Sequence, residues 1–305
     1  MKSVIVFSTL EYESMARELT GADCEAGQIE RRIFPDGERY FRIASDVNDR
    51  DVVLVGGTTS NDVTLELYDL ASTLVENGAS TLTLIVPWFG SSTMERAVKH
   101  GEAVTAKTRA RLFSSIPPAK LGNQIALLDL HSEGIQYYFE APLHPIHVYA
   151  KPVIEDLARD LGGSDFILGS TDAGRAKWVE SLANGLGVPA AFVFKRRHSA
   201  EKTEVTAVSA KLSGERVVIY DDMIRTGGSL MNAARAYRSA GASSVAAVTT
   251  HGIFANDALT RLRESGLFTA IASTDSHPNA RRLEKEGLKV RTIAPLFVPC
   301  FRRTT

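Results

Sequence analysis

One stretch limits the fold of this chain more than any other. Val217-Val218-Ile219-Tyr220 is followed directly by Asp221 and Asp222, and three residues later by Thr226-Gly227-Gly228-Ser229. The apolar run suits a strand covered on both faces, and the carboxylates are expected just past its carboxyl end, where open α/β sheets bind ligands. The glycine pair lets backbone N–H groups approach an anion, and a helix expected from residue 230 would point its positive end at it. These features predict a site for a phosphorylated sugar; an ordinary Asp-rich turn before a glycine-capped helix is the alternative.

Strand-like and helix-like segments alternate along the chain. The apolar strand-like segments are residues 52–55, 82–86, 125–128, 166–168, 190–194, 217–220 and 245–248, and helix-like segments include 63–76, 173–186 and 229–240. Such alternation indicates βαβ units and a mainly parallel sheet. The pattern starts again near residue 150, after Ala141-Pro142-Leu143-His144-Pro145. We therefore expect an α/β protein with two similar domains, residues 1–147 and 148–305, each a mainly parallel sheet flanked by helices.

Composition excludes several classes of protein. The chain has 305 residues and a formal net charge of −1, which argues against nucleic acid or a membrane surface as the main partner. No segment reaches the ~18 apolar residues of a membrane span, and the start of the chain lacks a signal-peptide pattern. Cys24 and Cys300 lack metal-site spacing, so a reduced, cytoplasmic location is expected. Neither of the common glycine-rich nucleotide motifs is present.

Six short motifs stand in order along the chain. They are Phe34-Pro35-Asp36-Gly37-Glu38, Pro87-Trp88-Phe89-Gly90 with Gly101-Glu102, Leu128-Asp129-Leu130-His131, Ser170-Thr171-Asp172-Ala173-Gly174, Lys195-Arg196-Arg197 and the 217–229 stretch. Each is weak alone, but together they resemble the ribose-phosphate diphosphokinase family, the 5-phosphoribosyl-1-pyrophosphate (PRPP) synthases, over nearly the whole chain. The resemblance implies two domains of the type I phosphoribosyltransferase fold, the second carrying the PRPP motif. It also implies transfer of diphosphate from ATP to the C1 hydroxyl of ribose 5-phosphate, which gives PRPP and AMP with Mg²⁺ as cofactor.

The resemblance assigns roles to residues of the second half. The ribose hydroxyls would contact Asp221 and Asp222, and the 5-phosphate would be held by Thr226, Gly227, Gly228 and Ser229. Catalysis would depend on Lys195 and Arg197, whose cations stabilise charge during diphosphoryl transfer, and segment 198–208 suits a loop that closes over substrate. A solvated basic cluster is the alternative.

Metal binding is expected at Asp172 and His131. Asp172 is also well suited to be a helix N-cap, and a lone His near a strand end is commonly structural. Mg²⁺ prefers oxygen ligands, so a single imidazole beside phosphate oxygens is acceptable. Arg175 stands where a second glycine is common in the family, and Arg225 where an acidic or small residue is usual.

ATP binding is expected in the first half. Phe34, Asp36 and Glu38 would contact the adenine bound by a neighbouring subunit, which implies a homo-oligomer; an ordinary Pro-Asp-Gly turn between two strands is the alternative. Where most members have an Arg-Gln pair, this chain has Thr93-Met94, followed by Glu95-Arg96. That version is similar to the plant-type, phosphate-independent branch, as is Thr250-His251-Gly252-Ile253-Phe254. Arg96 would then contact the triphosphate.

Other functions stay open at this point. One is a regulatory PRPP-synthase-associated subunit without activity, which the altered Thr93-Met94 pair favours. Another is a diphosphokinase for a different acceptor that contains ribose 5-phosphate. A phosphoribosyltransferase that consumes PRPP is disfavoured by the two-domain length and by residues 34–38.

Overall fold

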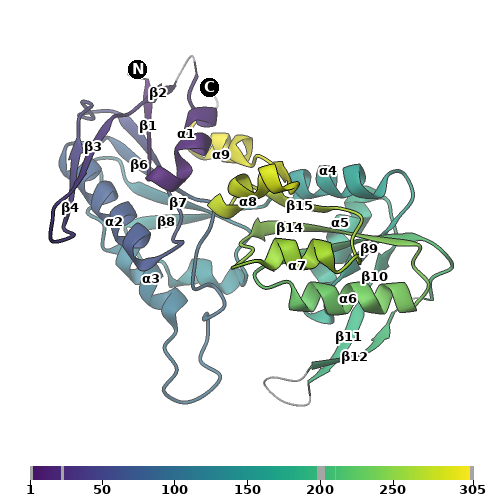
Figure 1. Cartoon of the computed structure of the whole chain (residues 1–305). Helices are drawn as coiled ribbons and strands as arrows, with labels where there is room; N and C mark the ends of the chain where they lie inside the picture. The colour runs from purple at the N-terminus through teal and green to yellow at the C-terminus, as the bar shows by residue number, and fades with distance from the viewer. Residues whose placement is uncertain (1–2, 22–23, 198–202, 210, 303–305) are drawn as a thin grey trace. The chain divides into compact units, whose positions relative to one another are not determined.

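The structure is a computed structural model that describes residues 3–21, 24–197, 203–209 and 211–302, apart from the side chains of residues 195–197 and 203–207. It divides into two compact units: Met1–Tyr149 with Ala294–Thr305, and Ala150–Ile293. This division differs from the expected one at residues 147 and 148, chiefly because helix α9 (Ala294–Phe301) belongs to the first unit, where it contacts α1 (Glu13–Leu19). Figure 1 shows these two helices side by side, in purple and yellow. Among the described residues, no helix is both long and apolar enough to cross a membrane.

The first unit contains a parallel sheet in the order β2-β1-β5-β6-β7-β8. The strands are β1 (Val4–Ser8), β2 (Cys24–Ala26), β5 (Asp51–Val55), β6 (Thr81–Val86), β7 (Asn123–Leu128) and β8 (Leu143–Val148). The stretch with two prolines, which the sequence placed at the domain boundary, includes the first half of β8. Pro145 lies in register with Ile125, and an edge strand tolerates this proline because one side has no neighbour to bond.

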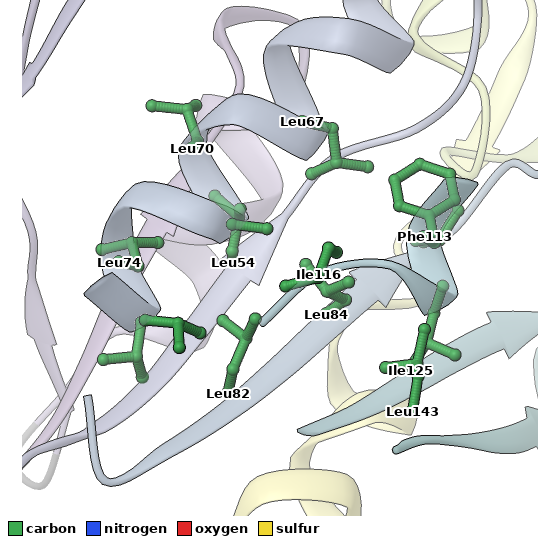
Figure 2. Close-up of a cluster of buried hydrophobic side chains, with 14 of the residues drawn as sticks. Leu54, Leu67, Leu70, Leu74, Leu82, Leu84, Phe113, Ile116, Ile125 and Leu143 are labelled. Carbon is green, nitrogen blue, oxygen red and sulfur yellow. The ribbon is translucent and has the colours of Figure 1, made fainter. Parts of the chain in front are cut away.

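Helices cover both faces of this sheet. They are η1 (Leu10–Tyr12), α1, α2 (Asn61–Glu76), α3 (Thr105–Ser114), η2 (Glu133–Tyr138) and α9. Figure 2 shows how Leu67, Leu70 and Leu74, one face of α2, pack over Leu54 and Leu82 of the sheet. Since alternate strand residues face opposite sides, Val53 and Val55 are buried on the face of α1 and α9.

The second unit repeats this architecture with strand order β10-β9-β13-β14-β15-β16, again all parallel. The strands are β9 (Ile167–Ser170), β10 (Ala190–Ala191), β13 (Arg216–Ile224), β14 (Ser244–Gly252), β15 (Ile271–Thr274) and β16 (Lys289–Arg291). The helices are α4 (Lys151–Gly162), η3 (Ala173–Arg175), α5 (Ala176–Leu186), α6 (Gly228–Ser239), α7 (Ala258–Glu264), α8 (Pro278–Leu283) and η4 (Glu284–Glu286). The α/β class and the two parallel-sheet domains are thus confirmed.

Two antiparallel hairpins stand outside the main sheets. In the first unit, β3 (Ile29–Ile33) pairs with β4 (Arg39–Ile43). In the second, β11 (Val193–Arg197) pairs with β12 (Thr203–Val208). The single strand expected at 190–194 is therefore divided between the main sheet and a hairpin.

Candidate functional site

Parallel pairing of β9 with β13 brings two of the expected site residues to one level of the second sheet. Ser170 is in register with Tyr220, so Asp172 and Asp222 both follow that pair by two residues. One expectation is corrected here. The strand β13 continues to Ile224, so the two aspartates lie inside it and not past its end. The paired register with β9 stops at Tyr220, whereas pairing with β14 continues, and this leaves both aspartates on a half-paired part of the strand.

Asp222 is engaged by the residue that replaces the family's glycine. Arg175 donates from Nη2 to Oδ2 of Asp222 across 2.6 Å, and only 4% of the Asp222 side chain is exposed, against 25% for Arg175. The sequence marks Arg175 as unusual, but its partner lies 47 residues away and depends on the β9–β13 pairing. This ion pair is the main feature of the site that sequence analysis missed.

Asp221 is perturbed by the same group of charges. Burial of its carboxyl group, then repulsion from and a hydrogen bond with Asp222, and then repulsion from Asp172, raise the pKa of Asp221 to about 8, while Arg175 opposes the shift. The physical cause is that a second negative charge is unfavourable next to Asp222 in a site with little access to water.

Asp172 caps the short helix η3. Its Oδ1 accepts a hydrogen bond of 2.9 Å from the backbone N–H of Gly174. The N-cap role that the sequence allowed for Asp172 is therefore present, and the metal-binding role stays a prediction.

Residues 226–229 form the entry to α6. Gly227 has φ 78°, in the left-handed region, and a Cβ there would lie 2.9 Å from side-chain atoms of Leu262, so both backbone and packing favour glycine. Thr226 and Ser229 are exposed, and no side chain caps the helix. Arg261 holds the loop by donating to the carbonyl of Thr226 at 3.2 Å. The first N–H groups of a 12-residue helix thus remain available for an anion.

Lys195 lies in the middle of β11 and Arg197 is its last residue, and the side chains of both are outside the described residues. Figure 1 shows the β11–β12 hairpin that carries them. The segment expected to be a loop over 198–208 is corrected in part, because Thr203–Val208 forms β12. Residues 198–202 lie outside the described part of the chain.

The motif at residues 34–38 is the turn of the β3–β4 hairpin. Phe34 and Glu38 close it with a backbone hydrogen bond of 2.8 Å, Glu38 N–H donates to Asp36 Oδ1 at 3.1 Å, and Gly37 has φ 92°. Phe34 is 45% exposed and meets Tyr40 edge-on. The turn chemistry anticipated as the alternative is present, and it displays an aromatic ring and two carboxylates to the outside.

A buried carboxylate fastens this hairpin to α2. Glu66 is 7% exposed and pairs with Arg31 of β3 at 3.4 Å and with Arg39 of β4 at 3.3 Å. Nothing in the sequence pattern marks Glu66, because a charged residue on a helix is normally exposed.

Arg96 lies in an irregular stretch, residues 91–104, that leads from β6 towards α3. Its side chain is 78% exposed and pairs with its neighbour Glu95 at 3.3 Å, while Met94 is 38% exposed. Within the described residues, the ion pair of Arg96 is with Glu95 and not with the 34–38 turn. Its triphosphate contact stays a prediction.

His131 follows β7 in a loop that a second histidine supports. Asp129 is buried with φ 34°, and Leu130 N–H donates to Nε2 of His147 at 3.0 Å. Burial lowers the pKa of His147, with Glu133 opposing the shift, so a neutral ring can accept this bond. His131 itself is partly exposed.

The described residues hold no group of three or more His, Cys, Asp or Glu side chains arranged to bind a metal ion. Mg²⁺ normally needs no such cage, since one or two protein ligands suffice when substrate phosphates and water supply the others. The oxygen donors of this chain therefore fit a magnesium ion that enters with a nucleotide.

Comparisons with known proteins agree with this arrangement. A family model described as the N-terminal domain of ribose phosphate pyrophosphokinase matches residues 4–116, and a phosphoribosyl transferase domain model matches residues 149–272. The ribose-phosphate pyrophosphokinase of Synechococcus elongatus is 32% identical over 276 residues, which cover 90% of this chain and 82% of that protein. That of Rhodopirellula baltica is 31% identical over 99% of this chain and 96% of its own length. The crystal structure of phosphoribosylpyrophosphate synthetase from Mycobacterium smegmatis superposes with a TM-score of 0.86 at 26% identity, covering 99% of this chain and 98% of that one.

Proposed function

The chain belongs to the ribose-phosphate pyrophosphokinase family, and from that premise we propose that it transfers the diphosphate of ATP to the C1 hydroxyl of ribose 5-phosphate. The products are PRPP and AMP. The observation that carries this function within the structure is the joint placement of Asp172, Asp221 and Asp222 at the carboxyl edge of a sheet whose next turn is a glycine-built anion site.

Roles in the sugar half of the reaction follow from this edge. Carboxylates of Asp221 and Asp222 accept hydrogen bonds from the ribose hydroxyls, and the N-terminus of α6 with the hydroxyls of Thr226 and Ser229 binds the 5-phosphate. The loop needs no adjustment to do so, because Gly227 already holds it in the left-handed conformation.

Binding of ATP and transfer of its diphosphate are assigned to residues of the first unit and to Lys195 and Arg197 of the β11–β12 hairpin. The Phe34 ring stacks on adenine, Asp36 and Glu38 accept from its amino group, and Arg96 contacts the triphosphate. Lys195 and Arg197 stabilise the charge that develops on the transferred group. Asp172 of the second unit and His131 of the first are each proposed as a ligand of Mg²⁺, and the ion would neutralise part of the triphosphate charge. The protein acts as a homo-oligomer, with no nucleic acid or membrane partner, in the cytoplasm.

The test is to incubate the full chain with MgATP and ribose 5-phosphate in phosphate-free buffer and to follow products by ³¹P NMR. Equal amounts of AMP and PRPP are expected, and none without ribose 5-phosphate. Formation of ADP would instead show transfer of a single phosphoryl group. No product at any enzyme concentration, with ribose 5-phosphate bound, would favour the inactive regulatory subunit.

The same assay tests resemblance to the phosphate-independent branch. Met94 can pack against a base but cannot read its edge, so activity should need no inorganic phosphate and should extend to GTP and CTP. Strict use of ATP with strong activation by phosphate would contradict this assignment.

A further inference from the structure

A guanidinium lies inside the acidic edge of the second sheet. Arg175 ends η3, beside the carboxylate of Asp222, and the two groups are joined by a hydrogen bond of 2.6 Å. A carboxylate as buried as that of Asp222 needs a fixed positive partner, because a charge that has lost its water and has no partner is strongly destabilising.

A second acidic side chain at this edge, Asp221, responds to the same cation. Both Asp172 and Arg175 act on the charge of Asp221, with opposite signs. Ribose 5-phosphate is itself an anion, so its approach to these acidic side chains requires positive charge there. That charge comes either from a divalent ion or from the protein, and arginine is the side chain that stays charged and matches a carboxylate geometrically.

The chain fills this need with its own residue. Resting on the function proposed above, we propose that Arg175 takes the place of a divalent cation at Asp222, so that ribose 5-phosphate binds to this protein without a metal ion at that carboxylate. The backbone supports a side chain at this position, since Arg175 has φ −110° and ψ 19°, which any residue can adopt.

Binding of Mn²⁺, measured by the EPR signal of the free ion in nucleotide-free protein, tests this. The variant is Arg175→Gln, which keeps length but removes charge. Lys177→Gln is the matched control, because Lys177 is exposed and lies two residues further along, on α5. We expect Arg175→Gln to gain a Mn²⁺ site at least tenfold tighter than any in the wild type or in Lys177→Gln. Adding Asp222→Asn to Arg175→Gln should remove it.

Equal Mn²⁺ binding by the wild type and Arg175→Gln would overturn the proposal and leave the pair a structural contact. If Arg175→Gln does not fold, by circular dichroism, calorimetry on the wild type decides: its affinity for ribose 5-phosphate should be the same with Mn²⁺ as with EDTA. A tenfold gain in affinity with Mn²⁺, lost in Asp222→Asn, would also overturn it. The sugar-free Mn²⁺ titration separates this proposal from the proposed function, which fails if ribose 5-phosphate does not bind under any condition.

Discussion

At the scale of single residues, the proposed sugar site places the carboxyl groups of Asp221 and Asp222 side by side. Asp222 is held in one position by Arg175, whereas Asp221 lies among like charges. The two adjacent aspartates of one strand therefore have different electrostatic surroundings. This asymmetry makes them separately testable.

Asp222→Asn should raise KM for ribose 5-phosphate about tenfold and leave KM for ATP nearly unchanged. The amide keeps the shape but loses a charge-assisted hydrogen bond, a difference of about 1.4 kcal/mol. Asp165→Asn is the control, because Asp165 is exposed and precedes β9, at the opposite edge of the sheet. A change confined to the KM for ATP would remove Asp222 from the sugar site.

The raised pKa of Asp221 predicts how stability changes with pH. The folded pKa of about 8 exceeds the ordinary 3.8, so the folded protein keeps a proton that the unfolded chain releases. This contribution to stability is complete below pH 3.8 and is lost as the pH rises towards 8. Asp221→Asn should remove this contribution. The urea midpoint of the variant minus that of the wild type should therefore increase as the pH is raised from 5 to 8.5. A difference that is constant with pH would show that Asp221 is ionised throughout.

At the scale of elements, two hairpins carry the groups that the main sheets cannot supply. Each projects beyond a parallel sheet, and the β3–β4 hairpin is fastened to α2 through Glu66. Catalytic or binding groups on such hairpins can be changed with little effect on the core.

Lys195→Ala should lower kcat by about 10² to 10³ and change substrate affinities far less, since its cation matters most as charge develops. Lys211→Ala is the control, an exposed lysine that follows β12. Steady-state kinetics with both substrates provide the measurement, and a kcat near that of the wild type would exclude Lys195 from catalysis.

Phe34→Ala should raise KM for ATP about tenfold through lost stacking of about 1–3 kcal/mol and leave KM for ribose 5-phosphate unchanged. The thermal midpoint should hardly change, because the ring is 45% exposed. Ile33→Ala, which truncates a neighbour that is 75% exposed, is the control. Equal effects of the two substitutions on KM for ATP would show that Phe34 does not stack on the base.

Elements governed by local pattern were predictable from sequence. Strands such as β6 and β7 and helix α2 have their full apolar signature within one segment, and they lie close to the expected positions. Features set by distant pairing were not. The Arg175–Asp222 pair needs the register of β9 on β13, and the length of β13 past Tyr220 needs β14 beside it. The edge strand β8 was not recognised because Pro145 within it and Pro142 just before it are typical of a linker.

At the scale of the whole molecule, the assignment of adenine to a neighbour's hairpin requires subunits to share sites. Lys195→Ala and Phe34→Ala should then complement each other when mixed and allowed to exchange subunits. Some sites would combine an intact Phe34 with an intact Lys195. The mixture should recover activity at low ATP above the sum of the two variants alone. Activity equal to that sum, with exchange verified by native mass spectrometry, would mean that each subunit is complete.

Because α9 belongs to the first unit, the unfolding of one unit affects the other. The second unit is spliced into the first, and the chain crosses between them after Tyr149 and again before Ala294. Residues 150–293 can be excised as one contiguous piece, whereas a chain cut at 149 would lack the helix that packs on α1. When the inserted unit unfolds, residues 150–293 become a flexible loop between the two segments of the first unit. Closing such a loop costs conformational entropy that grows with its length. Melting of the inserted unit should therefore loosen its host, even without any direct contact between them.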